Sequence, residues 1–124
     1  MGVNGLIISK IGVSKQQFNF REELAMIIVR NVFRLKFGKA KEGIALLKEG
    51  IAIQKRAGLE MNQRIMTDLV GKFYTLVLEL TVPNMGALEA NMPKVMGDKD
   101  WQANYQKFSA LVDSGYREIF TIVE

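Results

Sequence analysis

Apolar and polar residues alternate along residues 26–37, and this two-residue period is typical of a β-strand. One face of the predicted strand carries Ile27, Val29, Asn31, Phe33, Leu35 and Phe37, of which Asn31 is the single polar member. The other face mixes apolar with basic residues, namely Met26, Ile28, Arg30, Val32, Arg34 and Lys36. We therefore expect the first face to form core and the second to be half apolar and increasingly basic.

Residues 40–57 nearly repeat a seven-residue pattern, KEGIALL followed by KEGIAIQ, which predicts an amphipathic helix. Gly43 and Gly50 occupy the same position of the two repeats, on the apolar side. Because an interior glycine costs about 1 kcal/mol relative to alanine, we expect both glycines where the helix approaches the sheet closely. Gly58 follows the last turn, where a glycine commonly ends a helix.

The remaining chain predicts two strands over residues 60–69 and 73–82, joined by a hairpin at 68–72. A helix over 85–96 follows, which Pro93 should break or kink. A second amphipathic helix starts at Asp98 and continues to residue 112, residues 114–115 (SG) end it, and residues 116–123 form the last strand. Trp101, Tyr105 and Phe108 recur at helical spacing in it, and we interpret them as core side chains.

The predicted order, β-α-β-β-α-β, is that of an α+β domain with a ferredoxin-like fold and an antiparallel sheet. We assign residues 25–124 to this domain and residues 1–24 to an N-terminal extension. Residues 6–11 of the extension are compatible with a short strand. A flexible arm and an edge strand added in a dimer are the alternatives.

The 124 residues include no cysteine and no histidine, which excludes disulfides, thiolate chemistry, histidine metal ligands and a Ser-His-Asp triad. We expect no metal and no cofactor. No apolar run approaches the roughly 20 residues that span a bilayer, and the first residues lack a signal-peptide pattern, so we expect a cytoplasmic protein without a membrane partner. The net charge of +4 is scattered among acidic residues and indicates a solvated surface.

Several short segments together resemble the NIPSNAP family: GK at 38–39, RAG at 56–58, DKDWQANY at 98–105 and SGYREI at 114–119. The resemblance covers residues 25–124 and extends to the dimeric α/β-barrel superfamily, which includes antibiotic-biosynthesis monooxygenases. It implies that two four-stranded sheets pack face to face across a two-fold axis, with the helices outside. The half-apolar second faces of the first and third strands independently favour such a homodimer, because large apolar faces are rarely left in water.

RNA-recognition motifs share the same element order and use exposed aromatic side chains to stack bases. The run GKFYTLV at 71–77 keeps one of three expected aromatic positions, Phe73. Thr75 and Ile28 stand at the other two. We therefore expect no nucleic-acid partner.

The half-apolar face predicts a pocket between the two sheets of a dimer. Its candidate ligand-binding residues are Arg30, Arg34, Arg64, Phe73, Thr75 and Glu79, with Met61 as the alternative to Arg64 on the second strand. The arginines could hold an anionic ligand while Glu79 orients it or moves a proton. The alternative, which we favour, is that Arg30 or Arg34 pairs with Glu79 as a structural bridge between neighbouring strands.

We expect a homodimeric α/β-barrel protein that binds a small anionic or apolar ligand, either between sheet and helices or between the two sheets. A cofactor-independent monooxygenase or isomerase-like enzyme is the first alternative. A structural or interaction protein without a ligand is the second. Neither the ligand nor any catalytic residue follows from these patterns.

Overall fold

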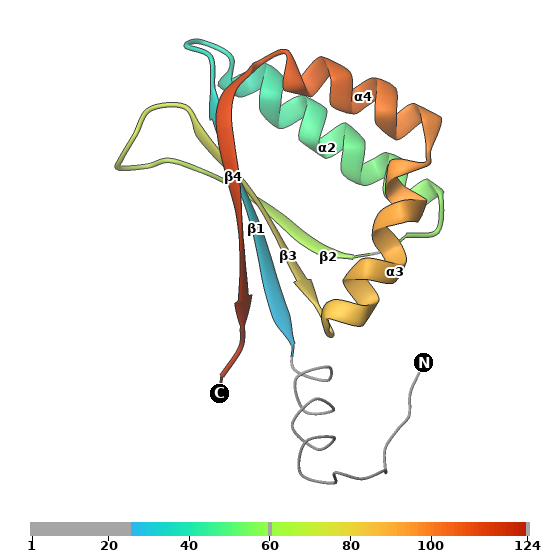
Figure 1. Ribbon diagram of the computed structural model, residues 1–124. Coiled ribbons are helices and arrows are strands. Elements are labelled where there is room, and N and C mark those ends of the chain that lie inside the picture. The colour runs from blue at the N-terminus through green and yellow to red at the C-terminus, as the bar shows by residue number, and fades with distance from the viewer. Residues whose placement is uncertain (1–25, 60, 124) are drawn as a thin grey trace, which may run out of the picture.

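A computed structural model describes residues 26–59 and 61–123 of the protein, so the predicted extension over residues 1–24 lies outside the described residues. Among the described residues, four strands form one antiparallel sheet in the order β2-β3-β1-β4, and three helices lie on one side of it (Figure 1). The strands are β1 (Ile27–Leu35), β2 (Asn62–Thr67), β3 (Thr75–Val82) and β4 (Val112–Thr121). The helices are α2 (Ala40–Arg56), α3 (Met85–Met96) and α4 (Lys99–Ser109). The predicted ferredoxin-like α+β fold is confirmed, with two helices in its second crossover.

The central strand is β1, because it pairs with β3 along one edge and with β4 along the other. Paired residues of an antiparallel sheet share a face, so the alternation of β1 sets the faces of its neighbours. The predicted core face is confirmed, since Ile27, Val29 and Leu35 are buried. Phe37 is an exception: it lies beyond the end of β1, is exposed, and packs against Tyr74 with ring centroids 4.7 Å apart.

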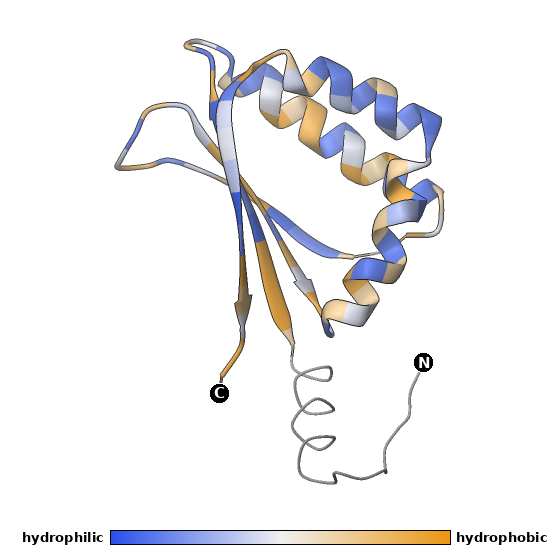
Figure 2. Ribbon diagram, in the orientation of Figure 1, coloured by the Kyte–Doolittle hydropathy of each residue, from blue (hydrophilic) through white to orange (hydrophobic). Residues whose placement is uncertain are grey.

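Two separate groups of buried side chains hold the helices to the sheet. The first consists of Ile27, Val29, Leu80, Val82 and Leu88, and the second of Leu35, Leu76 and Phe108. Figure 2 shows that α4, the second helix of the second crossover, is largely hydrophilic, as expected of a helix with one face in solvent. No helix among the described residues is both long enough and apolar enough to cross a membrane.

Helix α2 follows its predicted limits closely. The N–H of Gly58 donates to the carbonyl of Lys55, and the N–H of Leu59 donates to that of Gln54, which is a Schellman motif with Gly58 at φ +84°. Gly43 lies against the sheet as predicted, since a Cβ there would meet Leu35 Cδ1 at 2.8 Å. The same prediction is wrong for Gly50, where a Cβ would meet Asn104 Oδ1 of α4 at 3.1 Å.

Helix α3 has its predicted limits, and Pro93 lies inside it without breaking it. The second crossover departs from the sequence prediction at the end of α4. Helix α4 begins as predicted, with Asp98 Oδ1 accepting a hydrogen bond from the N–H of Trp101 at 2.9 Å, but ends at Ser109. Residues 112–115 were predicted to form the end of the helix. They start β4 instead, because they pair with β1, with a register shift between Arg34 and Leu35.

We expect Gly43→Ala to lower the free energy of unfolding, although alanine is the better helix former. The added methyl requires buried Leu35 to move, and overpacking of this kind costs about 1–3 kcal/mol, against a propensity gain of about 1 kcal/mol. Urea denaturation followed by circular dichroism measures the difference. Ala52→Gly, at an exposed position of the same helix, calibrates the propensity contribution. A clearly more stable Gly43→Ala protein would contradict the packing described above.

Candidate functional site

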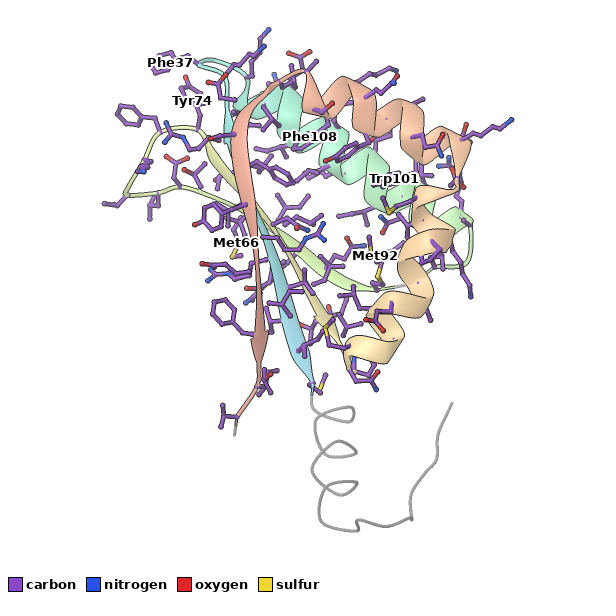
Figure 3. All side chains as sticks on the ribbon, in the orientation of Figure 1. Phe37, Met66, Tyr74, Met92, Trp101 and Phe108 are labelled. Carbon is purple, nitrogen blue, oxygen red and sulfur yellow. The ribbon has the colours of Figure 1, made fainter. Side chains whose placement is uncertain are left out.

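A cavity of about 530 Å³ lies between the sheet and the three helices. Its wall is mostly apolar and takes residues from all four described strands and all three described helices. Figure 3 shows Trp101 and Met92 on the helices at the side that faces the sheet, and Phe108 between α4 and the strands. The lining includes Val29, Phe33, Leu47, Ile51, Met61, Leu78, Leu80, Leu88, Met92, Val95 and Met96. The cavity therefore occupies the space between the two buried groups that hold the helices in place.

Five amide side chains interrupt this apolar wall, namely Asn31, Gln54, Gln63, Gln102 and Asn104. Gln63 Nε2 donates to Gln54 Oε1 at 2.8 Å, and this bond orients both side chains. Gln63 Oε1 is buried without a hydrogen-bond partner, and so is Asn104 Nδ2. Gln54 and Asn104 are themselves only 8% and 7% exposed. Since nearly all buried polar groups in proteins are paired, these two atoms require a physical explanation.

Asn31, the single polar residue on the core face of β1, lies next to Arg117 of β4 in the strand register. Arg117 Nε donates a hydrogen bond to Asn31 Oδ1 at 2.7 Å. Both residues line the cavity, and Arg117 is exposed. Its guanidinium is the only side chain with a permanent charge in the wall formed by the described residues.

Aromatic residues of α4 form another part of the wall. Trp101 and Tyr105 stack with ring centroids 5.0 Å apart and an interplanar angle of 13°. Phe108 is 1% exposed, and its ring meets Phe33 edge-on at 4.8 Å. The core prediction for these three residues is thus confirmed for Phe108, whereas Trp101 is half-buried and Tyr105 is exposed, and both line the cavity.

The wall of this cavity contains few ionisable groups. Among the described residues, the lining contains no Asp, Glu or Lys, so no carboxylate or amine stands ready to move a proton. Within residues 26–59 and 61–123, no group of three acidic side chains gathers as metal ligands. Amide groups and an indole can orient a ligand through hydrogen bonds and ring contacts.

Arg30, Arg64 and Glu79, three of the residues predicted to form a pocket, lie on the opposite, open face of the sheet. Glu79 Oε1 accepts from Arg64 Nε at 2.6 Å, while Arg30 Nε lies 3.4 Å from Glu79 Oε2 as an ion pair without hydrogen-bond geometry. The Glu79 side chain is 8% exposed, against 41% for Arg30 and 72% for Arg64. The favoured alternative, a cross-strand bridge to Glu79, is therefore present, with Arg64 as an additional partner. A ligand-binding role for these residues stays a prediction.

The other candidates are placed differently. Arg34 shares the open face, and its Nε is buried without a hydrogen-bond partner. Thr75 pairs with Arg34 on the open face, and its N–H donates to Asp68 Oδ1 while its hydroxyl donates to the carbonyl of Lys72 within the hairpin. Phe73 precedes β3, is exposed, and packs on Phe37. Met61 lies on the helix side among the cavity residues, away from Arg64.

Across the open face, acidic and basic residues alternate from strand to strand. The register places Arg64 of β2 opposite Glu79 of β3, Glu79 opposite Arg30 of β1, and Arg30 opposite Glu118 of β4. The neighbouring row is apolar and consists of Met66, Val77, Val32 and Tyr116. Figure 3 shows Met66 on the side of the sheet away from the helices. This face thus combines an apolar row with a row of charges that largely compensate one another.

The cavity amides were not identified from the sequence, although a pattern marked them. Asn31 interrupts the apolar face of a strand, Asn104 falls within the stripe of Trp101 and Phe108, and Gln54 falls on the same side of α2 as Ile51. Each is a polar residue at a position where the periodicity of its strand or helix predicts an apolar residue. Such positions point to buried polar groups, which are often functional.

The fold and the cavity define a ferredoxin-like α+β protein with a pocket between sheet and helices, and solved structures share this fold. No protein-family model matches the sequence, and no curated protein does. A NIPSNAP family protein from Agrobacterium tumefaciens is similar with a TM-score of 0.71 and 23% identity, over 81% of this chain and 88% of that protein. The resemblance to NIPSNAP proteins is thus confirmed at the level of the fold.

Two further structures extend the comparison. A second Agrobacterium tumefaciens NIPSNAP family protein, of unknown function, has a TM-score of 0.70 and 20% identity, over 80% of this chain and 89% of that protein. SnoaB, a cofactor-independent oxygenase from Streptomyces nogalater, has a TM-score of 0.62 and 13% identity, over 81% of this chain and 95% of the oxygenase. The fold is therefore shared by proteins of unknown function and by an oxygenase.

We expect Glu79→Gln to lower the melting temperature, because two arginines then lose their shared counter-charge. Hydrogen bonds to charged groups contribute about 1.5–3 kcal/mol, and the exposure of Arg64 places the expected loss at the lower end of that range. Differential scanning calorimetry measures it. Glu118→Gln is the matched control on the same face, with no ion pair among the described residues. Equal melting temperatures for the two variants would show that the bridge adds nothing to stability.

Proposed function

We propose that this protein binds a small molecule in the cavity between the sheet and the helices. The observation that carries the proposal is a cavity of about 530 Å³ whose mostly apolar wall contains two buried amide atoms without hydrogen-bond partners, Gln63 Oε1 and Asn104 Nδ2. Cavities of roughly 300–1,000 Å³, apolar with a few well-placed polar groups, are typical of small-molecule sites. This cavity has both properties.

The unfilled space between the helices and the sheet supports binding over a purely structural role. A structural core gains most by close packing, and an unfilled space between helices and sheet loses those contacts. Here the side chains of α2, α3 and α4 that face the sheet leave that space open instead of filling it. A ligand would restore the lost contacts and partner the amides.

A cofactor-independent oxygenase activity in the same cavity is the second candidate, favoured by the fold shared with SnoaB. Such an enzyme would need to hold and desolvate its substrate, which this wall can do. Proton removal would need a base, and the described lining offers none among its carboxylates or amines. Binding without catalysis is therefore the simpler function for this set of residues.

We also propose that two copies of the chain associate through the open sheet face. The apolar row of Met66, Val77, Val32 and Tyr116 would be covered in that arrangement. Alternation of Arg64, Glu79, Arg30 and Glu118 keeps the adjoining row close to neutral, which lowers the cost of desolvating it. Arg34, whose Nε has no hydrogen-bond partner among the described residues, could reach an acceptor on the second copy.

The binding proposal predicts that a compound which stabilises the protein loses its effect when the cavity is filled. Ile51→Trp places an indole at a half-buried lining position of α2. Ile44→Trp is the matched control, since Ile44 lies one heptad earlier on the same helix and packs in the second buried group, outside the lining. A thermal-shift screen of small molecules should give hits that persist in Ile44→Trp and vanish in Ile51→Trp. Hits that survive both changes would place the binding elsewhere.

The dimer proposal predicts a mass in solution of about twice the 14.0 kDa of the chain at low micromolar concentration. Light scattering measures this mass. Val77→Asp introduces a carboxylate into the apolar row and should dissociate the dimer, because a buried charge without a partner is unfavourable. Thr67→Asp, at an exposed position of β2 on the helix side, is the control and should leave the mass unchanged. A monomeric wild-type protein would contradict this mode of association.

A further inference from the structure

We propose that the ligand of the cavity is an uncharged molecule with an apolar body that carries one hydrogen-bond donor and one acceptor, as an amide or a lactam does. This inference rests on the proposed function and specifies the chemical class of the ligand. It follows from which polar atoms of the cavity are already paired and which are not.

Asn104 supplies the free donor. The residue lines the cavity from α4 and is 7% exposed, and its Nδ2 has no hydrogen-bond partner. Its Oδ1 faces α2, at 3.1 Å from the position that a Cβ would take on Gly50. The glycine thus makes room for the amide, and the amide nitrogen is left to bond an acceptor that the described residues do not provide.

Gln63 supplies the free acceptor. Its Nε2 is committed to Gln54 Oε1 at 2.8 Å, while its Oε1 is buried without a partner. Asn104 contacts α2 at Gly50, and Gln63 contacts it at Gln54, one helical turn later. The two unpaired amide atoms therefore lie beside the same stretch of that helix. A ligand seated there can meet a donor at one point and an acceptor at the other.

Both atoms are shielded from water and belong to residues that line the cavity, so we expect each amide to rotate when the ligand binds. Side-chain rotations of this kind commonly accompany binding where the backbone stays in place. An amide held without partners in the unliganded protein is unfavourable, and pairing it with a ligand relieves this cost. The same two atoms therefore favour a ligand that offers both complementary groups over one that offers neither.

The wall also selects against charge. Arg117 is the only permanently charged residue in the described lining, it is exposed, and its Nε is already bonded to Asn31 at 2.7 Å. The strand order places Arg117 of β4 on the far side of β1 and β3 from Gln63 of β2, so a carboxylate beside Gln63 would lie away from this cation. An ammonium group would meet no carboxylate, because the described lining contains none. Burying an unpaired charge is far less favourable than burying a paired neutral group.

Four probes of similar size test this class directly: para-ethylbenzamide, para-ethylbenzoate, para-ethylbenzamidinium and the hydrocarbon para-ethylisopropylbenzene. Their binding to the full chain is measured by ligand-observed NMR titration and by the shift in melting temperature. We expect the neutral benzamide to bind most tightly, by about tenfold or more over the charged probes and over the hydrocarbon.

Two variants identify the atoms responsible. Asn104→Leu and Gln63→Met replace the amides with apolar side chains of similar size, and Gln106→Met is the control at an exposed amide of α4 outside the lining. Each lining variant should weaken the benzamide and strengthen the hydrocarbon, which reverses the preference. The control should leave it unchanged. A merely structural role of the amides would lower the melting temperature without reversing the preference.

The outcomes separate the ligand class from the proposed function. If the hydrocarbon or a charged probe binds as well as the benzamide, and Ile51→Trp abolishes that binding, the ligand class is overturned and the cavity remains a binding site. If none of the four probes binds while the thermal-shift screen gives hits that Ile51→Trp abolishes, the ligand class is overturned and the cavity remains a binding site. If that screen gives no such hits either, the proposed function is overturned as well. A benzamide preference that survives Asn104→Leu and Gln63→Met also overturns the assignment.

Discussion

The pairing of β1 along both of its edges is the constraint on which the rest of the structure depends. With β3 on one side and β4 on the other, the alternation of a single strand assigns a face to residues on all four strands, because β2 takes its register from β3. Val29 and Leu35 therefore belong to the helix side, and Arg30 and Val32 to the open side. A shift of one residue would exchange the two sets. The cavity and the open face are thus two consequences of one register.

On the helix side, the cavity results from how the helices meet one another as well as from how they meet the sheet. Helix α4 lies against α2, and Gly50 permits the close approach of Asn104 at that contact. At the other end of α2, Gly43 brings the helix down onto Leu35. The two glycines of the repeat therefore have different partners, one in the sheet and one in a helix. The cavity lies along the later part of α2, where Leu47, Gly50, Ile51 and Gln54 contribute to a mostly apolar wall that amides interrupt.

On the open side, charge is balanced within the sheet itself. Glu79 is more deeply buried than either of its arginine partners, so the arginine side chains cover the carboxylate and keep their own charged ends near water. This arrangement is compatible with a surface that packs against another surface without a net charge. The apolar row beside it supplies the area for such packing. The open face thus carries an ion-pair network, while the amide groups of the cavity lie on the other face.

The sequence by itself determined the element order, the two faces of β1 and β3, the limits of α2 and α3, and the cap at Asp98, because these depend on residues close together in the chain. The end of α4 was predicted wrongly, since residues 112–115 form hydrogen bonds with a strand about 80 residues earlier and local periodicity does not report such pairing. Only the tertiary structure decided the candidate site. Asn31, Gln54, Gln63 and Asn104 come from four different elements, and no local pattern relates them. Their convergence depends on the packing of α2 and α4 over the sheet, which is set by contacts between residues far apart in the sequence.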